Sequence, residues 1–162
     1  MDSMSSATAP LTPSLAQRPG ALAPILVGGL AAGALDATSA FITFGFGMPR
    51  AIASGLLGAK AFQGGTATWI LGLLLHFFIT VCAAAVYWLA SRKLEFLRTH
   101  FFVCGLFYGI AVFLVMNLVV LPLSAIPFPV GPFTVAGLYK GLLAHMLLVG
   151  LPIALSLRYL GK

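Results

Sequence analysis

Four long apolar segments dominate the hydrophobic pattern of this chain. They cover residues 21–46, 66–90, 101–121 and 133–157, and few polar side chains interrupt them. A helix needs about 20 mainly apolar residues to cross the hydrocarbon core of a bilayer. Backbone groups in lipid must be satisfied within the segment, which favours helices. The pattern therefore predicts an all-α integral membrane protein with a four-helix transmembrane bundle in residues 21–162.

The segments outside these spans are polar or rich in glycine and proline. Residues 1–20 are rich in Ser, Thr, Pro and Ala, which predicts a disordered tail. The first apolar segment exceeds the about 7–15 apolar residues of a signal peptide, so we expect it to be a helix that stays in the membrane. Segment 122–132 contains four prolines and no charge, which predicts an ordered, non-helical cap near the membrane surface.

Segment 47–65 is too short and too rich in glycine to span a bilayer. We expect a short helix that lies in the membrane interface between the first two spans. The residues that suggest it are the apolar Ile52, Leu56, Leu57 and Phe62 and the basic Arg50 and Lys60. Pro152, which follows Gly150, is expected to kink the fourth helix near its end.

The composition supports the membrane assignment. Hydrophobic residues make up 60% of the chain and charged residues only 7%, whereas a soluble domain carries about 25% charged residues. The net charge is +6, but the Lys and Arg residues are spread among the gaps between spans. Nucleic-acid binding needs a basic face or stripe, so we expect no nucleic-acid partner. Isolated Lys and Arg near helix ends suit contacts with lipid headgroups.

The distribution of Lys and Arg also predicts the orientation. Basic residues accumulate on the cytoplasmic side of the membrane. Both termini are therefore expected in the cytoplasm, with segments 47–65 and 122–132 on the outer face. The side assigned to the cytoplasm carries Arg18, Arg92, Lys93, Arg98, Arg158 and Lys162, and the other side carries Arg50, Lys60 and Lys140.

Three ionisable residues are expected at a similar depth in the bilayer. At about 1.5 Å per residue, Asp36 and His76 lie roughly 15 Å from the outer ends of their spans, and His145 lies roughly 18 Å from its own. Polar side chains at membrane depth are costly and usually face the bundle interior. Asn117, nearer the outer surface, is a fourth candidate. Lys140 is expected to extend outward, with an ion pair to Asp36 as the alternative.

Small residues share helix faces with these candidates, which is typical of helix contacts in membranes. The expected stripes are Gly29, Ala32, Gly33, Asp36, Ala40 and Thr43 in the first helix, Gly72, His76, Thr80 and Ala83 in the second, Gly105 and Gly109 in the third, and Gly137, Gly141 and His145 in the fourth. We therefore expect Asp36, His76 and His145 to face one another inside the bundle.

Three hypotheses for this polar layer stay open. It could be a hydrogen-bonded cluster that holds the helices in register. It could be a proton or ligand site, since histidine changes charge near neutral pH. His76 and His145 could also bind a haem between facing helices, or a zinc ion together with Asp36. No cofactor is predicted as such.

Sequence motifs for enzymatic chemistry are missing. The chain has no G-x-S-x-G, P-loop, dinucleotide fingerprint or H-E-x-x-H motif, which leaves enzymatic activity uncertain but disfavoured. Cys82 and Cys104 lie in apolar segments without a C-x-x-C pair. We expect both to be small buried hydrophobic residues.

The chain resembles small four-helix inner-membrane proteins of bacteria, the YagU-like proteins. The features that carry the resemblance are GGLAAGALDA (28–37), the histidine of the second helix after AFQGG (61–65), and the proline-containing loop before the fourth helix. The chain lacks the longer, more charged outer loop of those proteins. The resemblance implies a location in the bacterial inner membrane and no particular activity.

Abundant small-residue stripes and missing catalytic motifs favour a non-enzymatic membrane protein. It would be an accessory subunit of a larger complex or a small homo-oligomer. The alternative is a proton-linked small transporter or channel component that uses Asp36, His76 and His145, in which case four helices would need to dimerise.

Overall fold

The computed structural model describes residues 20–128 and 134–161, and every regular element in these ranges is helical. Four helical stretches among the described residues are long and apolar enough to cross a membrane. The predicted fold, a four-helix bundle of an integral membrane protein, is thereby confirmed. In chain order the elements are α1 (Leu22–Phe44), η1 (Gly45–Gly47), α2 (Met48–Leu57), η2 (Gly58–Gln63), α3 (Thr66–Ser91), α4 (Phe96–Thr99), α5 (Phe101–Val115), η3 (Met116–Val120), α6 (Leu121–Leu123), α7 (Val135–Ala144), η4 (His145–Gly150) and α8 (Leu151–Leu160).

The helix ends lie within a few residues of the predicted boundaries. α1 ends at Phe44, where Gly45 has a φ of 70° and turns the chain toward η1 and α2. Glycine adopts this backbone conformation without strain. The third span continues through Pro122 to Leu123, so the first two residues of the expected non-helical cap are helical. Residues 1–19 of the expected tail (1–20) lie outside the described residues, and so does Phe133 of the fourth span.

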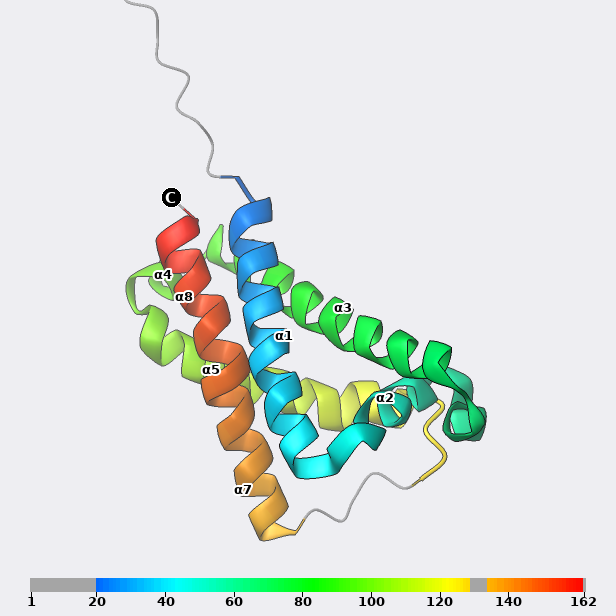
Figure 1. Cartoon of the computed structure of the whole chain (residues 1–162). Coiled ribbons are helices and arrows are strands. Elements are labelled where there is room, and N and C mark those ends of the chain that lie inside the picture. Colours follow the sequence, from blue (N-terminus) through cyan, green and yellow to red (C-terminus); the bar gives the residue numbers. More distant parts are fainter. Residues whose placement is uncertain (1–19, 129–133, 162) are drawn as a thin grey trace, which may run out of the picture.

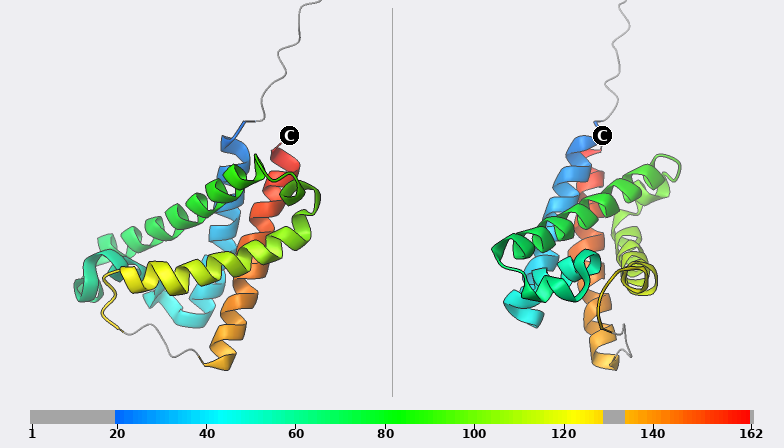
Figure 2. Two further views of the ribbon diagram at one scale, coloured as in Figure 1. Left: turned by 180° about the vertical axis from the view of Figure 1, so that it is seen from behind. Right: turned by 90° about the vertical axis from the view of Figure 1, so that its right-hand side faces the viewer.

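The four spans pack in the order α3, α1, α8 and α5. α1 contacts α3 on one side and α8 on the other, and α5 packs against α8 and η4 (Figure 1). α3 and α5 meet through Tyr87 and Tyr108, whose ring centroids lie 4.8 Å apart. The Tyr108 hydroxyl donates a hydrogen bond of 2.7 Å to the Ala83 carbonyl oxygen. Figure 2 shows the inclined courses of α3 and α5 from two further sides.

Glycines bring the spans into close contact, as predicted. A Cβ atom added to Gly29 would lie 2.6 Å from the Val81 Cα of α3. On α5, a Cβ at Gly105 would lie 2.9 Å from the Ala154 Cβ, and one at Gly109 would lie 2.4 Å from the His145 carbonyl oxygen. Such approach is the usual basis of helix association in lipid, where hydrophobic burial does not drive it.

The small-residue prediction was wrong for part of the fourth helix. Gly137 is exposed, and an added Cβ would meet only the nearby Thr134 side chain. Gly150 makes the tight contact instead, since its added Cβ would lie 2.0 Å from the Gly105 carbonyl oxygen. In the first helix the stripe is buried at Ala32 and Gly33 but exposed at Thr43. Helix pairs therefore meet over shorter lengths than a continuous stripe suggests.

The expected short helix after the first span is α2, and it packs against α3. The predicted apolar face is not the one it buries, since Leu56 and Leu57 are exposed and Met48 and Ser54 are buried. Gly72 of α3 permits this contact, because an added Cβ would lie 1.7 Å from the Pro49 carbonyl oxygen of α2. The segment is thus an integral part of the bundle.

Two π-helical segments precede the prolines of the last two spans. η3 ends two residues before Pro122, and η4 ends two residues before Pro152. Proline has no amide hydrogen, and its ring clashes with the carbonyl group four residues earlier. The wider π turn relieves this clash within the helix. A π-helical segment therefore precedes Pro152, where a kink was expected, and a second one precedes Pro122, which was assigned to the loop from the sequence.

The expectation that both cysteines are buried was wrong for Cys82, which is exposed on α3, whereas Cys104 is half-buried. In a membrane protein an apolar side chain gains little from facing a helix instead of lipid, since lipid tails are equally apolar. Hydrophobicity alone therefore does not indicate which face of a span a cysteine occupies.

We predict that Gly109→Ala lowers the free energy of unfolding by about 1–3 kcal/mol, because the methyl group would overlap the His145 carbonyl group and force η4 away. SDS titration in mild detergent, followed by circular dichroism, measures this effect. Gly47→Ala is the matched control, since nothing lies within 4 Å of its added Cβ. Equal stability of the two variants would contradict the packing role of Gly109.

Candidate functional site

A cavity of about 330 Å³ lies within the bundle and brings three of the four candidate residues together. Most of its wall is apolar, with residues from α2, α3, α5 and η3. The titratable side chains in its lining are Asp36, His76 and His145. A small-molecule site typically combines such an apolar wall with a few convergent polar groups.

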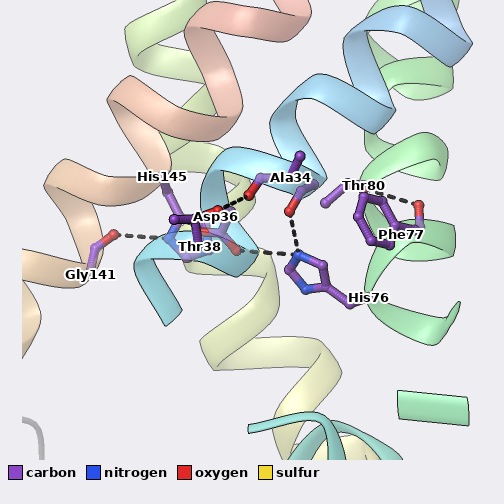
Figure 3. A network of polar contacts seen from close by, with 9 residues as sticks. Ala34, Asp36, Thr38, His76, Phe77, Thr80, Gly141 and His145 are labelled. Carbon is purple, nitrogen blue, oxygen red and sulfur yellow. Dashed lines mark hydrogen bonds and ion pairs between the residues drawn. The ribbon is translucent and has the colours of Figure 1, made fainter. Parts of the chain in front are cut away.

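His76 connects α3 to α1 at one side of this cavity. Its side chain is buried, and Nε2 lies 3.0 Å from the Gly33 carbonyl oxygen. Because a carbonyl oxygen only accepts hydrogen bonds, Nε2 carries the hydrogen. The Asp36 Oδ2 atom lies 3.9 Å from the same nitrogen (Figure 3). In the neutral imidazole, Nδ1 is then the atom with a free lone pair.

Asp36 owes its position to the small-residue face of α1. It follows Gly33 by three residues and therefore lies one helical turn further along nearly the same face. Gly33 has no side chain to separate the helices, and its added Cβ would lie 2.7 Å from the Thr80 hydroxyl oxygen. The close approach of α1 and α3 at Gly33 places the Asp36 carboxylate beside His76.

His145 enters the cavity lining from the fourth span, at the first residue of η4. Its Nδ1 atom donates a hydrogen bond of 2.9 Å to the Gly141 carbonyl oxygen of its own helix. The ring also meets Phe113 edge to face at a centroid distance of 5.3 Å. With Nδ1 protonated, the neutral ring keeps its lone pair on Nε2. The two histidines thus have opposite tautomers.

The fourth candidate, Asn117, does not line the cavity. It is half-buried in η3, and its Nδ2 atom donates a hydrogen bond of 2.8 Å to the Phe113 carbonyl oxygen. Its neighbours Met116 and Val120, which lie four residues apart on one side of the helix, do line the cavity. Asn117 therefore lies outside the cavity that Asp36, His76 and His145 line, and its part in a site stays a prediction.

Lys140 extends outward, as expected. The side chain is exposed, and the ion pair of Asp36 within the described residues is the one with His76. Asp36 and two imidazoles therefore form the ionisable part of the cavity lining without a neighbouring lysine or arginine.

Several lining residues had no signal in the sequence. Ala51, Ile52 and Gly55 come from α2, which was expected at the membrane surface, and Ser124 and Ile126 follow α6. The Ala125 amide donates a hydrogen bond of 2.9 Å to the Gly55 carbonyl oxygen and holds this segment against α2. Small and apolar residues of this kind form no recognisable sequence motif, so only the fold shows that they line the cavity.

The described part of the chain contains no preformed metal site. There, no group of three or more His, Cys, Asp or Glu side chains is placed to hold a metal ion. The His76 Nε2 atom is also engaged with the Gly33 carbonyl oxygen. Zinc binding by Asp36, His76 and His145 and haem binding by the two histidines stay predictions.

Comparison with family models, curated proteins and solved structures finds no match for this chain. The resemblance to YagU-like proteins therefore stays a prediction. The cavity and its side chains are the basis for inferring a function.

We predict that His76→Leu lowers the free energy of unfolding by about 0.6–1.7 kcal/mol, the range for interhelical hydrogen bonds in membranes. The substitution removes the donor to the Gly33 carbonyl oxygen. SDS titration in mild detergent measures the change. His100→Leu is the control, because His100 is exposed and bonds only the neighbouring Thr99 side chain. An unchanged His76→Leu variant would show that this hydrogen bond contributes no stability.

Proposed function

We propose that this integral membrane protein is a non-enzymatic, proton-linked binding protein for a small, mostly apolar molecule with a protonated amine. The observation that carries the proposal is that Asp36, His76 and His145, from three different spans, line the same cavity. Ionisable groups at membrane depth are costly and mark ligand or proton pathways more often than structural contacts.

The chemistry of the polar groups suggests the ligand class. The hydrogens on His76 Nε2 and His145 Nδ1 are both directed to backbone carbonyl groups. What the site offers a ligand is therefore the Asp36 carboxylate and imidazole lone pairs, all of which accept hydrogen bonds. A ligand with N–H donors and a positive charge matches these groups, and an apolar body matches the rest of the wall.

The link to protons follows from the same groups. Protonation of either imidazole adds a positive charge and converts an acceptor nitrogen into a donor. A protonated amine would then be repelled from the site. The ligand and the proton therefore compete, and binding of the amine should weaken as pH falls.

The hydroxyl groups of the cavity support a non-enzymatic role. The Thr80 hydroxyl donates to the Phe77 carbonyl oxygen, and the Ser124 hydroxyl donates to the Leu121 carbonyl oxygen. An activated nucleophile needs a base within hydrogen-bond reach, whereas these hydroxyls are bonded to backbone of their own segments. Membership of a larger complex, homo-oligomer formation and transport stay predictions.

We further propose a bacterial inner-membrane location with both termini in the cytoplasm. The support is the concentration of Arg92, Lys93, Arg98 and Arg158 at the end of the bundle that holds both termini of the described chain. Single-cysteine variants in a Cys82→Ala, Cys104→Ala background test the orientation. An impermeant maleimide should label Gly65→Cys in intact cells and Thr99→Cys only after cell disruption. The opposite labelling would invert the topology.

We predict that the purified protein in nanodiscs binds benzylamine more tightly at about pH 8 than at about pH 5, because a protonated imidazole in the cavity would repel the ammonium group. Asp36→Asn should weaken binding at least about tenfold, since it removes a charged acceptor. Ala51→Leu should also weaken binding by filling part of the cavity. Equilibrium dialysis measures the affinity of the wild type at both pH values and the affinities of the Asp36→Asn and Ala51→Leu variants.

Ala31→Leu is the matched control, because Ala31 is exposed and does not line the cavity. Benzyl alcohol, which is neutral, should bind without this pH dependence. If Asp36→Asn and the wild type bind benzylamine equally, and Ala51→Leu leaves binding unchanged, the proposed site is wrong. In that case the polar layer holds the helices together instead.

A further inference from the structure

A second cavity, of about 590 Å³, lies at the end of the bundle where the described chain begins and ends. In Figure 1 the start of α1, the end of α3, α4 and the end of α8 gather around this position. We call it the arginine pocket. It is separate from the cavity of Asp36, and its lining residues are Ala21, Trp88, Ser91, Arg92, Arg98, Leu157 and Gly161.

The two arginines are held by contacts with the surrounding helices. The Arg92 guanidinium carbon lies 5.1 Å from the ring centroid of Trp88, a cation–π contact. Arg98 of α4 donates a hydrogen bond from Nη2 to the Gly161 carbonyl oxygen at the end of α8. α4 itself is fixed by Tyr87, whose hydroxyl donates a hydrogen bond of 3.1 Å to the Leu97 carbonyl oxygen. The pocket is therefore built from ordered elements.

Positive charge in the arginine pocket is not neutralised by a carboxylate of the described chain. The two acidic residues in the described ranges are Asp36, which belongs to the other cavity, and Glu95, which forms no ion pair. Trp88 and Leu157 contribute apolar surface to the pocket, and Arg92 is exposed to solvent. A guanidinium group has five N–H donors, and the contact with Gly161 uses only part of those on Arg98.

We propose that the arginine pocket binds a phosphate group. The planar guanidinium fork matches phosphate oxygens in a bidentate manner, and two such groups line this one pocket. Basic pockets between helices on the cytoplasmic side suit phospholipid headgroups, and free phosphate presents the same oxygens. The site is independent of the amine cavity, so either proposal can fail alone.

Two measurements on the purified full-length protein separate the sources of phosphate. Native mass spectrometry, with phosphatidylglycerol or phosphatidylcholine added to the detergent, reports lipids retained per chain. Isothermal titration of the delipidated protein with inorganic phosphate, with chloride as the reference, reports binding of the free ion. If the pocket binds a lipid headgroup, we expect one phosphatidylglycerol per chain, preferred at least about tenfold over phosphatidylcholine. If it binds free phosphate, we expect saturable binding of inorganic phosphate and no preference between the two lipids.

Arg92→Gln and Arg98→Gln should each weaken binding of phosphatidylglycerol or phosphate at least about tenfold. Arg92→Gln is the decisive variant, since Arg92 is exposed and its contact with Trp88 is peripheral, whereas Arg98→Gln also removes a cap of α8. Lys60→Gln, at an exposed position of η2 outside the pocket, is the control for loss of one positive charge. If neither phosphatidylglycerol nor phosphate is preferred, or Arg92→Gln binds like the wild type, the proposal is overturned, and the arginines serve only their contacts with Trp88 and Gly161.

Discussion

Close contact between helix backbones at glycine is the constraint on which this structure depends. Lipid tails do not drive apolar helices together, so the spans associate where their backbones can touch. Gly109 of α5 lies directly against the His145 carbonyl group, and Gly33 of α1 allows α3 to approach until His76 reaches its carbonyl oxygen. The residues that hold the helices together are therefore neighbours of those that line the cavity, and packing and chemistry share the same positions.

The cavity follows from the same contacts. α1 meets α3 at Gly29 and Gly33, and α5 meets the fourth span at Gly105 and Gly109. The contact between α1 and α8 joins these two pairs of helices. The tyrosine contact joins α3 to α5 at one end, and α2 with the segment after α6 covers the other end. The space between is mostly apolar, and its ionisable groups are Asp36, His76 and His145.

Much of the fold and part of the site could be predicted from the sequence because bilayer thickness fixes helix length. Counting residues from the span ends placed Asp36 and His76 at one depth, and the structure brings them within 3.9 Å. Asn117 lies outside this cavity, and its side chain bonds the Phe113 carbonyl oxygen of its own helix. Such a local hydrogen bond cannot be predicted from residue spacing. The contribution of α2 was missed because an amphipathic segment looks the same whether its apolar face meets lipid or protein.

The two π-helical segments have a consequence for how the chain can vary over evolution. A π turn holds one more residue than the α-helical turn it replaces, and η3 and η4 each end two residues before a proline whose ring the wider turn accommodates. Loss of one residue from either segment, together with its proline, would return that span to a regular α-helix of nearly the same length. Related chains can thus differ by single insertions inside a membrane span and still keep the same helix order, with a different set of side chains facing the cavity.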